Sequence, residues 1–259
     1  MSTEMGDKNT GRTLTGTASA VGPDTLVLDG LSIARGPREV VHAVTLDVPA
    51  GQVAAMLGPN GAGKSTIALA IAGMARITKG SITLGGEKLS GIRPEKVRAA
   101  GVSVVPEGRR LLPELSVEDN LKVATYSLGK RAAAEGLEYT LSLFPELEKR
   151  WAIGGRLLSG GEQQMVVLAQ ALVSQPRVLV VDELSLGLAP IVVKRLVPVL
   201  AKVSASGVGV LLIEQFAHVA LSLATKAYVL EGGRVRYSGT SQELTEHPDM
   251  LHSAYLLGH

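Results

Sequence analysis

The chain has 259 residues, enough for one large α/β domain, and 46% of them are hydrophobic although only 3% are aromatic. The net charge of +2 gives no reason to expect a nucleic-acid surface, and the lack of cysteine excludes disulfides, thiolate metal sites and cysteine nucleophiles. The polar N-terminus has no signal core, and no apolar run approaches the roughly 20 residues that cross a bilayer. We therefore expect a soluble cytoplasmic chain with an aliphatic core.

The first part of the chain predicts a tail followed by an antiparallel flap. Residues 1–23 are rich in Thr, Gly and Ser and predict a disordered N-terminal tail, and residues 24–259 predict a single domain. Residues 25–29 and 40–48 are strand-like and have a turn cluster between them. We expect these two strands to form a flap beside the rest of the domain.

From residue 53 onwards, strands alternate with helices. Strand patterns occupy 53–57, 81–86 with its turn, 102–107 with a polar loop, 178–183 and 208–213, and helical patterns occupy 94–99, 117 to about 147 and 191–206. This order predicts an α/β fold with a mostly parallel core sheet, whose functional site lies at the carboxyl ends of the strands. A helical subdomain is predicted at about 107–175, and we expect its Trp151 to be a packing residue.

A glycine-rich loop lies between the strand at 53–57 and an apolar helix. Its sequence is Gly58-Pro59-Asn60-Gly61-Ala62-Gly63-Lys64-Ser65-Thr66. The glycines let the backbone close around an anion, with N–H groups pointing inward beside the positive end of the helix. We expect Lys64 to reach the β- and γ-phosphates and Ser65 to ligate Mg²⁺. The stretch therefore predicts a nucleotide-binding P-loop.

Two carboxylates end the apolar strand at 178–183. A strand this apolar is not expected to face water, so Asp182 and Glu183 are poorly explained as a solvated surface. Nucleotide hydrolysis needs one carboxylate to hold Mg²⁺ and a second to polarise the attacking water. Asp182 fits the first role and Glu183 the second, whereas an ordinary acidic turn is the alternative interpretation.

The segment Leu158-Ser159-Gly160-Gly161-Glu162-Gln163-Gln164 permits two interpretations. Ser159 and Glu162 have the spacing of a capping box at the start of a helix. Two glycines in the first helical turn are poor helix formers, however. They suit a backbone that presses against a bound anion.

This segment, the P-loop and the Val-Asp-Glu strand in this order closely resemble the ATP-binding-cassette (ABC) ATPases. The resemblance covers about residues 25 to 257 and implies a P-loop NTPase fold that binds ATP and Mg²⁺. It also implies that residues Leu158, Ser159, Gly160, Gly161 and Glu162 act in trans. They would cap the γ-phosphate held by a second subunit in a head-to-tail dimer.

Three further segments resemble one branch, the LivF-type ATPases of branched-chain amino-acid importers. Residues 106–121 begin Pro106-Glu107-Gly108-Arg109-Arg110, where most relatives have Gln in place of Glu107. The likeness gives Glu107 a role at ATP and Mg²⁺. Residues 185–190 resemble the D-loop of the branch. Gln215 matches its switch region, where His is more usual, and is expected to hydrogen-bond the γ-phosphate.

Two residues depart from the family pattern. Arg35 stands where an aromatic side chain normally stacks on adenine, and either its guanidinium lies over the base or the stacking is lost. Leu184 stands where proline is expected, which predicts a less rigid Glu183 and a slow ATPase. Because Gln215 cannot titrate, Glu183 is the expected proton acceptor, assisted by Gln215 and Lys64.

These observations together predict an ATP-hydrolysing subunit of an importer for branched-chain or other hydrophobic amino acids, peripheral at the cytoplasmic face of the membrane. The implied partners are a second ABC ATPase subunit, as a homodimer or a LivG-like heterodimer, two permease subunits and an extracytoplasmic binding protein. Importers of urea or short-chain amides are alternatives, as is a degenerate nucleotide-binding partner with little turnover. A soluble ABC ATPase of translation or DNA maintenance is disfavoured by the single cassette and the lack of a heptad run.

Overall fold

The computed structural model describes residues 24–249, so the predicted tail at 1–23 and the end of the chain at 250–259 lie outside the described residues. The strands are β1 (Leu26–Arg35), β2 (Arg38–Val48), β3 (Val53–Leu57), β4 (Arg76–Leu84), β5 (Glu87–Lys88), β6 (Val102–Val105), β7 (Val178–Asp182), β8 (Gly209–Glu214), β9 (Lys226–Glu231) and β10 (Arg234–Thr240). The α-helices are α1 (Lys64–Ile71), α2 (Pro94–Ala99), α3 (Val117–Ala124), α4 (Lys130–Leu143), α5 (Gly160–Leu172), α6 (Pro190–Ala205), α7 (Ala217–Leu221) and α8 (Ser241–Glu246), with 3-10 helices η1 (Pro145–Arg150) and η2 (Gly155–Leu157).

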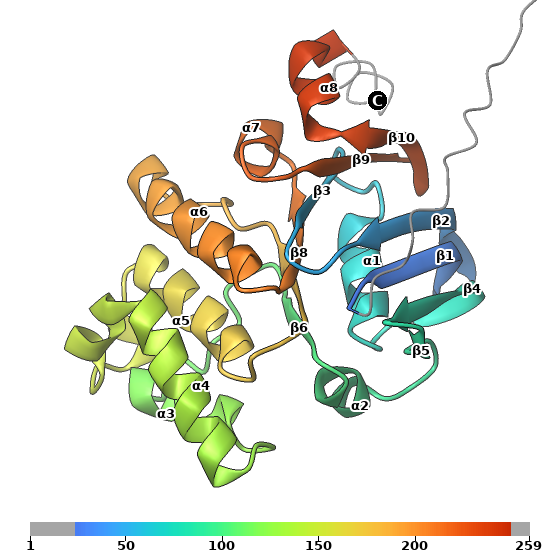
Figure 1. Ribbon diagram of the computed structural model, residues 1–259. Helices are drawn as coiled ribbons and strands as arrows, with labels where there is room; N and C mark the ends of the chain where they lie inside the picture. The colour runs from blue at the N-terminus through green and yellow to red at the C-terminus, as the bar shows by residue number, and fades with distance from the viewer. Residues whose placement is uncertain (1–23, 250–259) are drawn as a thin grey trace, which may run out of the picture.

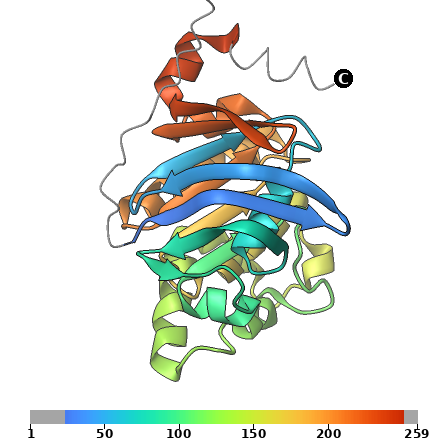
Figure 2. The ribbon, with the colours of Figure 1, turned by 90° about the vertical axis from the view of Figure 1, so that its right-hand side faces the viewer.

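The first sheet is antiparallel, with strand order β2-β1-β4-β5 (Figure 2). Its strands β1 and β4 are longer than the sequence predicts. The strand β1 continues beyond Asp29 because Gly30 has a φ of 55° and the pairing register shifts there, which is a bulge that bends the strand without ending it.

The second sheet is the core of the molecule, with strand order β10-β9-β3-β8-β7-β6 (Figure 1). All its pairings are parallel except that of β10 with β9. Every residue of β3, β7 and β8 is buried, which explains why these strands are continuous apolar runs. The predicted fold class, with a mostly parallel core sheet, an antiparallel flap and a helical insertion, is confirmed.

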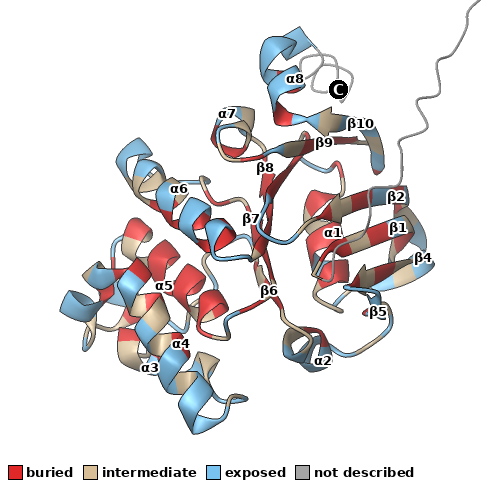
Figure 3. Ribbon diagram, viewed as in Figure 1, coloured by how far each residue is buried: buried red, intermediate tan, exposed pale blue. Residues whose placement is uncertain are grey.

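Two hydrophobic clusters lie on opposite faces of the core sheet. Val53, Ala55 and Leu57 belong to the cluster that includes α5 and α6, whereas Ala54 and Met56 belong to the cluster that includes α1 and the antiparallel sheet. This alternation is the two-residue period of a strand that is covered on both faces. Figure 3 shows the buried core strands between the helices and the antiparallel sheet.

The helices α3, α4 and α5 lie between β6 and β7 in the chain and form the helical lobe on one side of the core sheet (Figure 1). Trp151 is partly buried and packs against the cluster that includes α5, so its predicted packing role is confirmed. Among the described helices, none is both long enough and apolar enough to cross a membrane.

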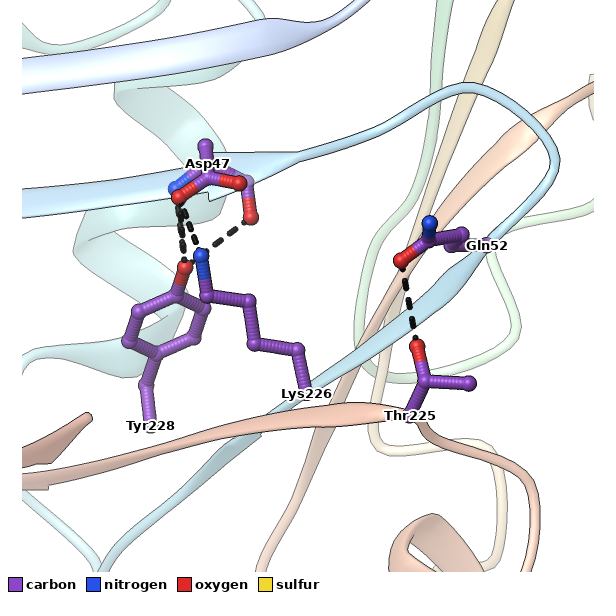
Figure 4. Close-up of polar contacts among 5 residues, drawn as sticks. All are labelled: Asp47, Gln52, Thr225, Lys226 and Tyr228. Carbon is purple, nitrogen blue, oxygen red and sulfur yellow. Dashed lines mark hydrogen bonds and ion pairs between the residues drawn. The ribbon is translucent and has the colours of Figure 1, made fainter. Parts of the chain in front are cut away.

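A polar network joins the two sheets (Figure 4). The Tyr228 hydroxyl on β9 accepts a hydrogen bond from the Asp47 backbone N–H on β2 at 3.0 Å and lies 3.1 Å from the Asp47 carboxylate. Lys226 pairs with the same carboxylate. Thr225 donates to the Gln52 side chain at 3.2 Å nearby. Because Tyr228 is otherwise buried, this network fixes the antiparallel sheet against the core sheet.

Candidate nucleotide site

The parallel strands of the core sheet end at one edge, and the predicted site residues lie at the ends of β3, β6, β7 and β8. Leu57 of β3 is opposite Glu214 of β8, and Asp182 of β7 is opposite Ile213. Val105, the last residue of β6, is opposite Val181. The P-loop and the residues that follow β6, β7 and β8 therefore meet at the carboxyl edge of the sheet, where α/β folds bind ligands.

Close backbone approach explains two glycines of the P-loop. Gly63 precedes α1 with a φ of 105°, a conformation that L side chains rarely adopt. A Cβ atom on Gly58 would lie 2.2 Å from the carbonyl oxygen of Leu230 on β9. The loop is thus packed against its own sheet, and only glycine fits at position 58.

The Lys64 side chain folds back over the P-loop. Its ammonium group donates hydrogen bonds to the carbonyl oxygens of Gly58 at 2.8 Å and Pro59 at 3.1 Å, and the residue is only 4% exposed. Burial lowers the pKa of Lys64, and the carboxylates of Glu183 and Asp182 oppose that shift. The cation thus lies within the loop that the sequence predicts to bind phosphate.

Asp182 is a buried acid that lies against the P-loop. It is 3% exposed and accepts a hydrogen bond from the Ser65 side chain. Its Oδ1 atom has no hydrogen-bond partner among residues 24–249. Burial raises its pKa to about 6, the Ser65 bond lowers it, and the charge of Glu183 raises it further.

The oxygen donors of Asp182 and Ser65 suit Mg²⁺, which binds proteins through one or two carboxylates and completes its shell with phosphates and water. The unpartnered Oδ1 atom of Asp182 fits this interpretation. Within the described part of the chain, no group of three or more His, Cys, Asp or Glu side chains forms a metal cage.

Glu183 follows Asp182 in an uncommon backbone conformation, with a φ of 57°. Its side chain is partly exposed. Burial raises the pKa of Glu183, the charge of Glu107 adds to this, and Lys64 opposes it. A carboxylate with a raised pKa beside a P-loop is a candidate general base.

A cleft of about 530 Å³ gathers most of the predicted residues. Those that line it are Arg35, Asn60, Gly61, Gly63, Lys64, Ser65, Thr66, Glu107, Asp182, Glu183 and Gln215. Gly58, Pro59 and Ala62 belong to the P-loop but are not among the lining residues. Val40, Arg110 and Leu186 also line the cleft, and the sequence analysis gave them no role.

The trans segment is not part of the lining of this cleft. Ser159 caps α5, because its hydroxyl accepts from the Glu162 N–H at 3.3 Å and the Glu162 carboxylate accepts from the Ser159 N–H at 2.8 Å. Arg150 also donates to Glu162, at 2.6 Å. The capping box is therefore present, and Leu158 before it is buried.

The two glycines after Ser159 have contacts within the chain. A Cβ atom on Gly160 would lie 2.6 Å from Nη1 of Arg109, and one on Gly161 would lie 2.9 Å from the Val192 side chain. Besides the bound anion that the sequence predicts, each glycine thus has a steric reason within the chain. The Arg109 guanidinium also donates to the carbonyl oxygens of Leu186 at 3.2 Å and Gly187 at 2.8 Å.

Two charged residues at this edge were given no role by sequence reasoning. Glu214 is 1% exposed and accepts two hydrogen bonds from Ser185, and Arg109 joins the residues after β6 to those after β7. A carboxylate at the end of the apolar strand β8 was the available signal for Glu214. The contacts of Arg109 carry no local signal, because they depend on segments far apart in the chain.

Comparisons with known proteins agree with this geometry. The ABC transporter family model matches residues 41–185, more than half of the chain. The chain is 38% identical to the high-affinity branched-chain amino acid transport ATP-binding protein BraG of Pseudomonas aeruginosa, over 90% of this chain and 100% of BraG. It is 34% identical to the probable branched-chain amino acid transport ATP-binding protein LivF of Archaeoglobus fulgidus, over 80% of this chain and 89% of that protein.

A solved structure of an ATP-binding subunit of an ABC transporter superposes with a TM-score of 0.77 at 29% identity, over 89% of this chain and 98% of the other. Fold, cleft and sequence likeness point the same way. The chain belongs to the ABC transporter ATPase family, whose members bind and hydrolyse ATP to drive transport.

Proposed function

We propose that the chain is the ATPase subunit of an importer for branched-chain or other hydrophobic amino acids. The observation that carries the proposal is the likeness to BraG over all of that protein's length. The branch-like segment 106–121 supports it, since Glu107 lines the nucleotide cleft and Arg109 contacts the residues after β7. The proposed partners are a second ATPase subunit, two permeases at the cytoplasmic face of the membrane and, indirectly, an extracytoplasmic binding protein.

In this proposal the P-loop holds the triphosphate of ATP. The Lys64 ammonium would exchange its carbonyl partners for β- and γ-phosphate oxygens. Ser65, Asp182 and Glu107 would hold Mg²⁺. The metal would supply charge stabilisation at the phosphates. Glu183 accepts the proton of the attacking water, and the Gln215 side chain orients that water and the γ-phosphate.

A head-to-tail dimer completes the proposed site. Three apolar side chains near the trans segment and the turn after β7 are exposed: Leu157 at 79%, Leu186 at 45% and Ile191 at 73%. Exposed apolar side chains beside the trans segment and this turn support an interface there. The N–H groups at the start of α5 and the Ser159 hydroxyl would then cap the γ-phosphate bound by the second subunit.

A groove of about 400 Å³ supports docking of the permeases. It is lined by Val104 of β6 and Pro106 just after that strand, and by Val123 and Tyr126 from the proposed helical subdomain at 107–175. Tyr126 is 94% exposed and Val123 is 51% exposed. We propose that a cytoplasmic segment of a permease fills this groove, so that closure of the ATPase dimer moves the permeases.

The decisive experiment is transport by proteoliposomes that contain this chain, its partner ATPase and the permeases. ATP-dependent accumulation of leucine, abolished by Lys64→Ala, is the expected result. Accumulation of urea or a short-chain amide instead would contradict the proposed cargo. The docking variant is Tyr126→Glu, which should abolish transport and leave basal ATPase activity unchanged. Its control is Met74→Glu, at an exposed apolar side chain outside the groove (65%), which should leave both transport and ATPase activity unchanged.

A degenerate partner with little turnover is the second candidate, favoured by Arg35, by Leu184 in place of proline and by Gln215 in place of histidine. The convergence of Lys64, Asp182 and Glu183 on one cleft argues against it. Phosphate release by the purified chain distinguishes the two. Phosphate release that depends on Glu183 supports the ATPase. Normal ATP binding without phosphate release supports the degenerate partner.

A further inference from the structure

The turn after β7 holds Glu183 in a conformation that needs support from its surroundings. A φ of 57° is rarely occupied by residues other than glycine, and it persists only where neighbouring groups fix it. The Glu183 N–H donates to the carbonyl oxygen of Ile213 on β8 at 2.9 Å. Whatever holds residues 183–185 therefore decides the direction of the Glu183 carboxylate.

The Glu214 carboxylate holds the other end of this turn. Its Oε1 atom accepts from the Ser185 N–H at 3.0 Å, and its Oε2 atom accepts from the Ser185 hydroxyl at 2.9 Å. The two oxygens thus bind the two donors of one residue, two positions after Glu183. Glu214 is 1% exposed and lies between the turn and β3, where it pairs with Leu57.

A buried carboxylate is a costly way to hold a loop. An apolar side chain of the same size at a buried position often stabilises the fold as much or more. The turn also has the fully buried Leu184 where a proline would fix the backbone angle φ. Two groups of β8 therefore restrain the turn. The Ile213 carbonyl oxygen accepts from the Glu183 N–H, and the Glu214 carboxylate accepts from the Ser185 N–H.

We propose that Glu214 is a positioning residue, which fixes the turn 183–185 through Ser185 and so aims the Glu183 carboxylate at the attacking water. The inference rests on the proposed role of Glu183 as the base. Glu214 is not among the residues that line the nucleotide cleft, so it acts through the turn and not on the nucleotide. Because Gln215 follows it directly, the same strand end places both the orienting amide and the restraint on the base.

The test compares variants that keep or remove the acceptors. Glu214→Gln keeps one acceptor for the Ser185 N–H and offers an amide to the Ser185 hydroxyl, so turnover should stay within about threefold of the wild type. Glu214→Met has a similar size but no such acceptor. We expect its kcat to fall about 10- to 100-fold with ATP affinity within about twofold, as misplacement of a reacting group predicts.

A control removes another carboxylate that accepts two hydrogen bonds from a single residue. Glu146 accepts two hydrogen bonds from Arg195, at 2.6 and 3.0 Å, and lies outside the nucleotide cleft. Glu146→Met should leave kcat within about twofold. Ser185→Ala removes only the hydroxyl hydrogen bond, so it should lower kcat by a smaller factor than Glu214→Met does. In the Glu214→Met background, Ser185→Ala should lower kcat by less still.

The decisive readout is the double variant with Glu183→Gln. If Glu214 acts through Glu183, Glu214→Met has no further effect on the residual hydrolysis of Glu183→Gln. A purely structural role predicts that the two losses multiply, and this result would overturn the inference. Should Glu214→Met fail to fold, the Ser185→Ala series gives the same comparison in the Glu183→Gln background.

The outcomes separate this inference from the proposed function. If Glu183→Gln hydrolyses ATP like the wild type, Glu183 is not the base, and both the proposed chemistry and the role of Glu214 are wrong. If Glu183→Gln is inactive but Glu214→Met and Ser185→Ala keep the wild-type kcat, only the positioning role fails. A fall in ATP affinity without a fall in kcat would also overturn it.

Discussion

Asp182 offers a sharp test of the site in the absence of nucleotide and metal. It is 3% exposed, its Oδ1 atom has no hydrogen-bond partner within residues 24–249, and burial raises its pKa to about 6 from an ordinary value of 3.8. The folded chain therefore binds this proton more tightly than the unfolded chain does. Ionisation of Asp182 destabilises the fold until a cation arrives.

The pH window follows from these two pKa values. Below about pH 3.8 both states hold the proton and the penalty is absent; between 3.8 and 6 it grows, and above 6 it is complete. A difference of about two pKa units corresponds to about 3 kcal/mol, with about half of that reached at pH 5. The loss of stability as pH rises is the sign expected for an acid whose pKa is raised by folding.

The substitution Asp182→Asn removes the charge and keeps an acceptor for the Ser65 hydroxyl. In EDTA and without nucleotide, we expect its melting temperature at pH 8 to exceed that of the wild type by up to roughly 6 to 12 °C, and by less at pH 5. Differential scanning fluorimetry across pH 5 to 8 measures both. Mg²⁺ with ATP should then stabilise the wild type at pH 8 by more than it stabilises the variant.

The control is the same substitution at an exposed position. Asp29→Asn on β1 should leave the melting temperature unchanged at every pH. If Asp182→Asn were no more stable than the wild type at pH 8, or if its gain did not depend on pH, burial of an uncompensated charge would be refuted.

Three further substitutions test the loops of the site. Gly160→Ala places a Cβ atom 2.6 Å from Nη1 of Arg109, so the guanidinium should move and ATPase activity should fall. If Gly160→Ala lowers the activity equally in an Arg109→Ala background, a bound anion and not Arg109 is the reason for Gly160. Gly58→Ala places a Cβ atom 2.2 Å from a backbone oxygen, and we expect a loss of about 1 to 3 kcal/mol in the free energy of unfolding, measured by urea denaturation, together with weaker ATP binding. Arg35 lines the cleft from an exposed position, and if it stacks on the base at about 1 kcal/mol, Arg35→Ala should weaken ATP binding about fivefold. A competition assay with GTP measures this selectivity, and an ATP preference unchanged by the substitution would exclude a role for Arg35.

Local patterns predicted most of the fold. Apolar runs located β3, β7 and β8, because strands that are buried on both faces have apolar side chains on both faces. The extents of β1 and β4 were wrong, since a bulge at Gly30 lets β1 continue where the sequence suggests a break. The hairpin of β9 and β10 received no prediction, although an apolar run followed by Gly232-Gly233 is a usable signal.

The sequence by itself determined the P-loop, the paired acids and the strand ends on which they lie, because each depends on residues adjacent in the chain. Only the tertiary structure decided what surrounds them. The Arg109 side chain beside Gly160, the Glu214 carboxylate on Ser185 and the Tyr228 hydroxyl on Asp47 join segments far apart in sequence. Such contacts follow from strand order and side-chain packing, and no local pattern of residues encodes them.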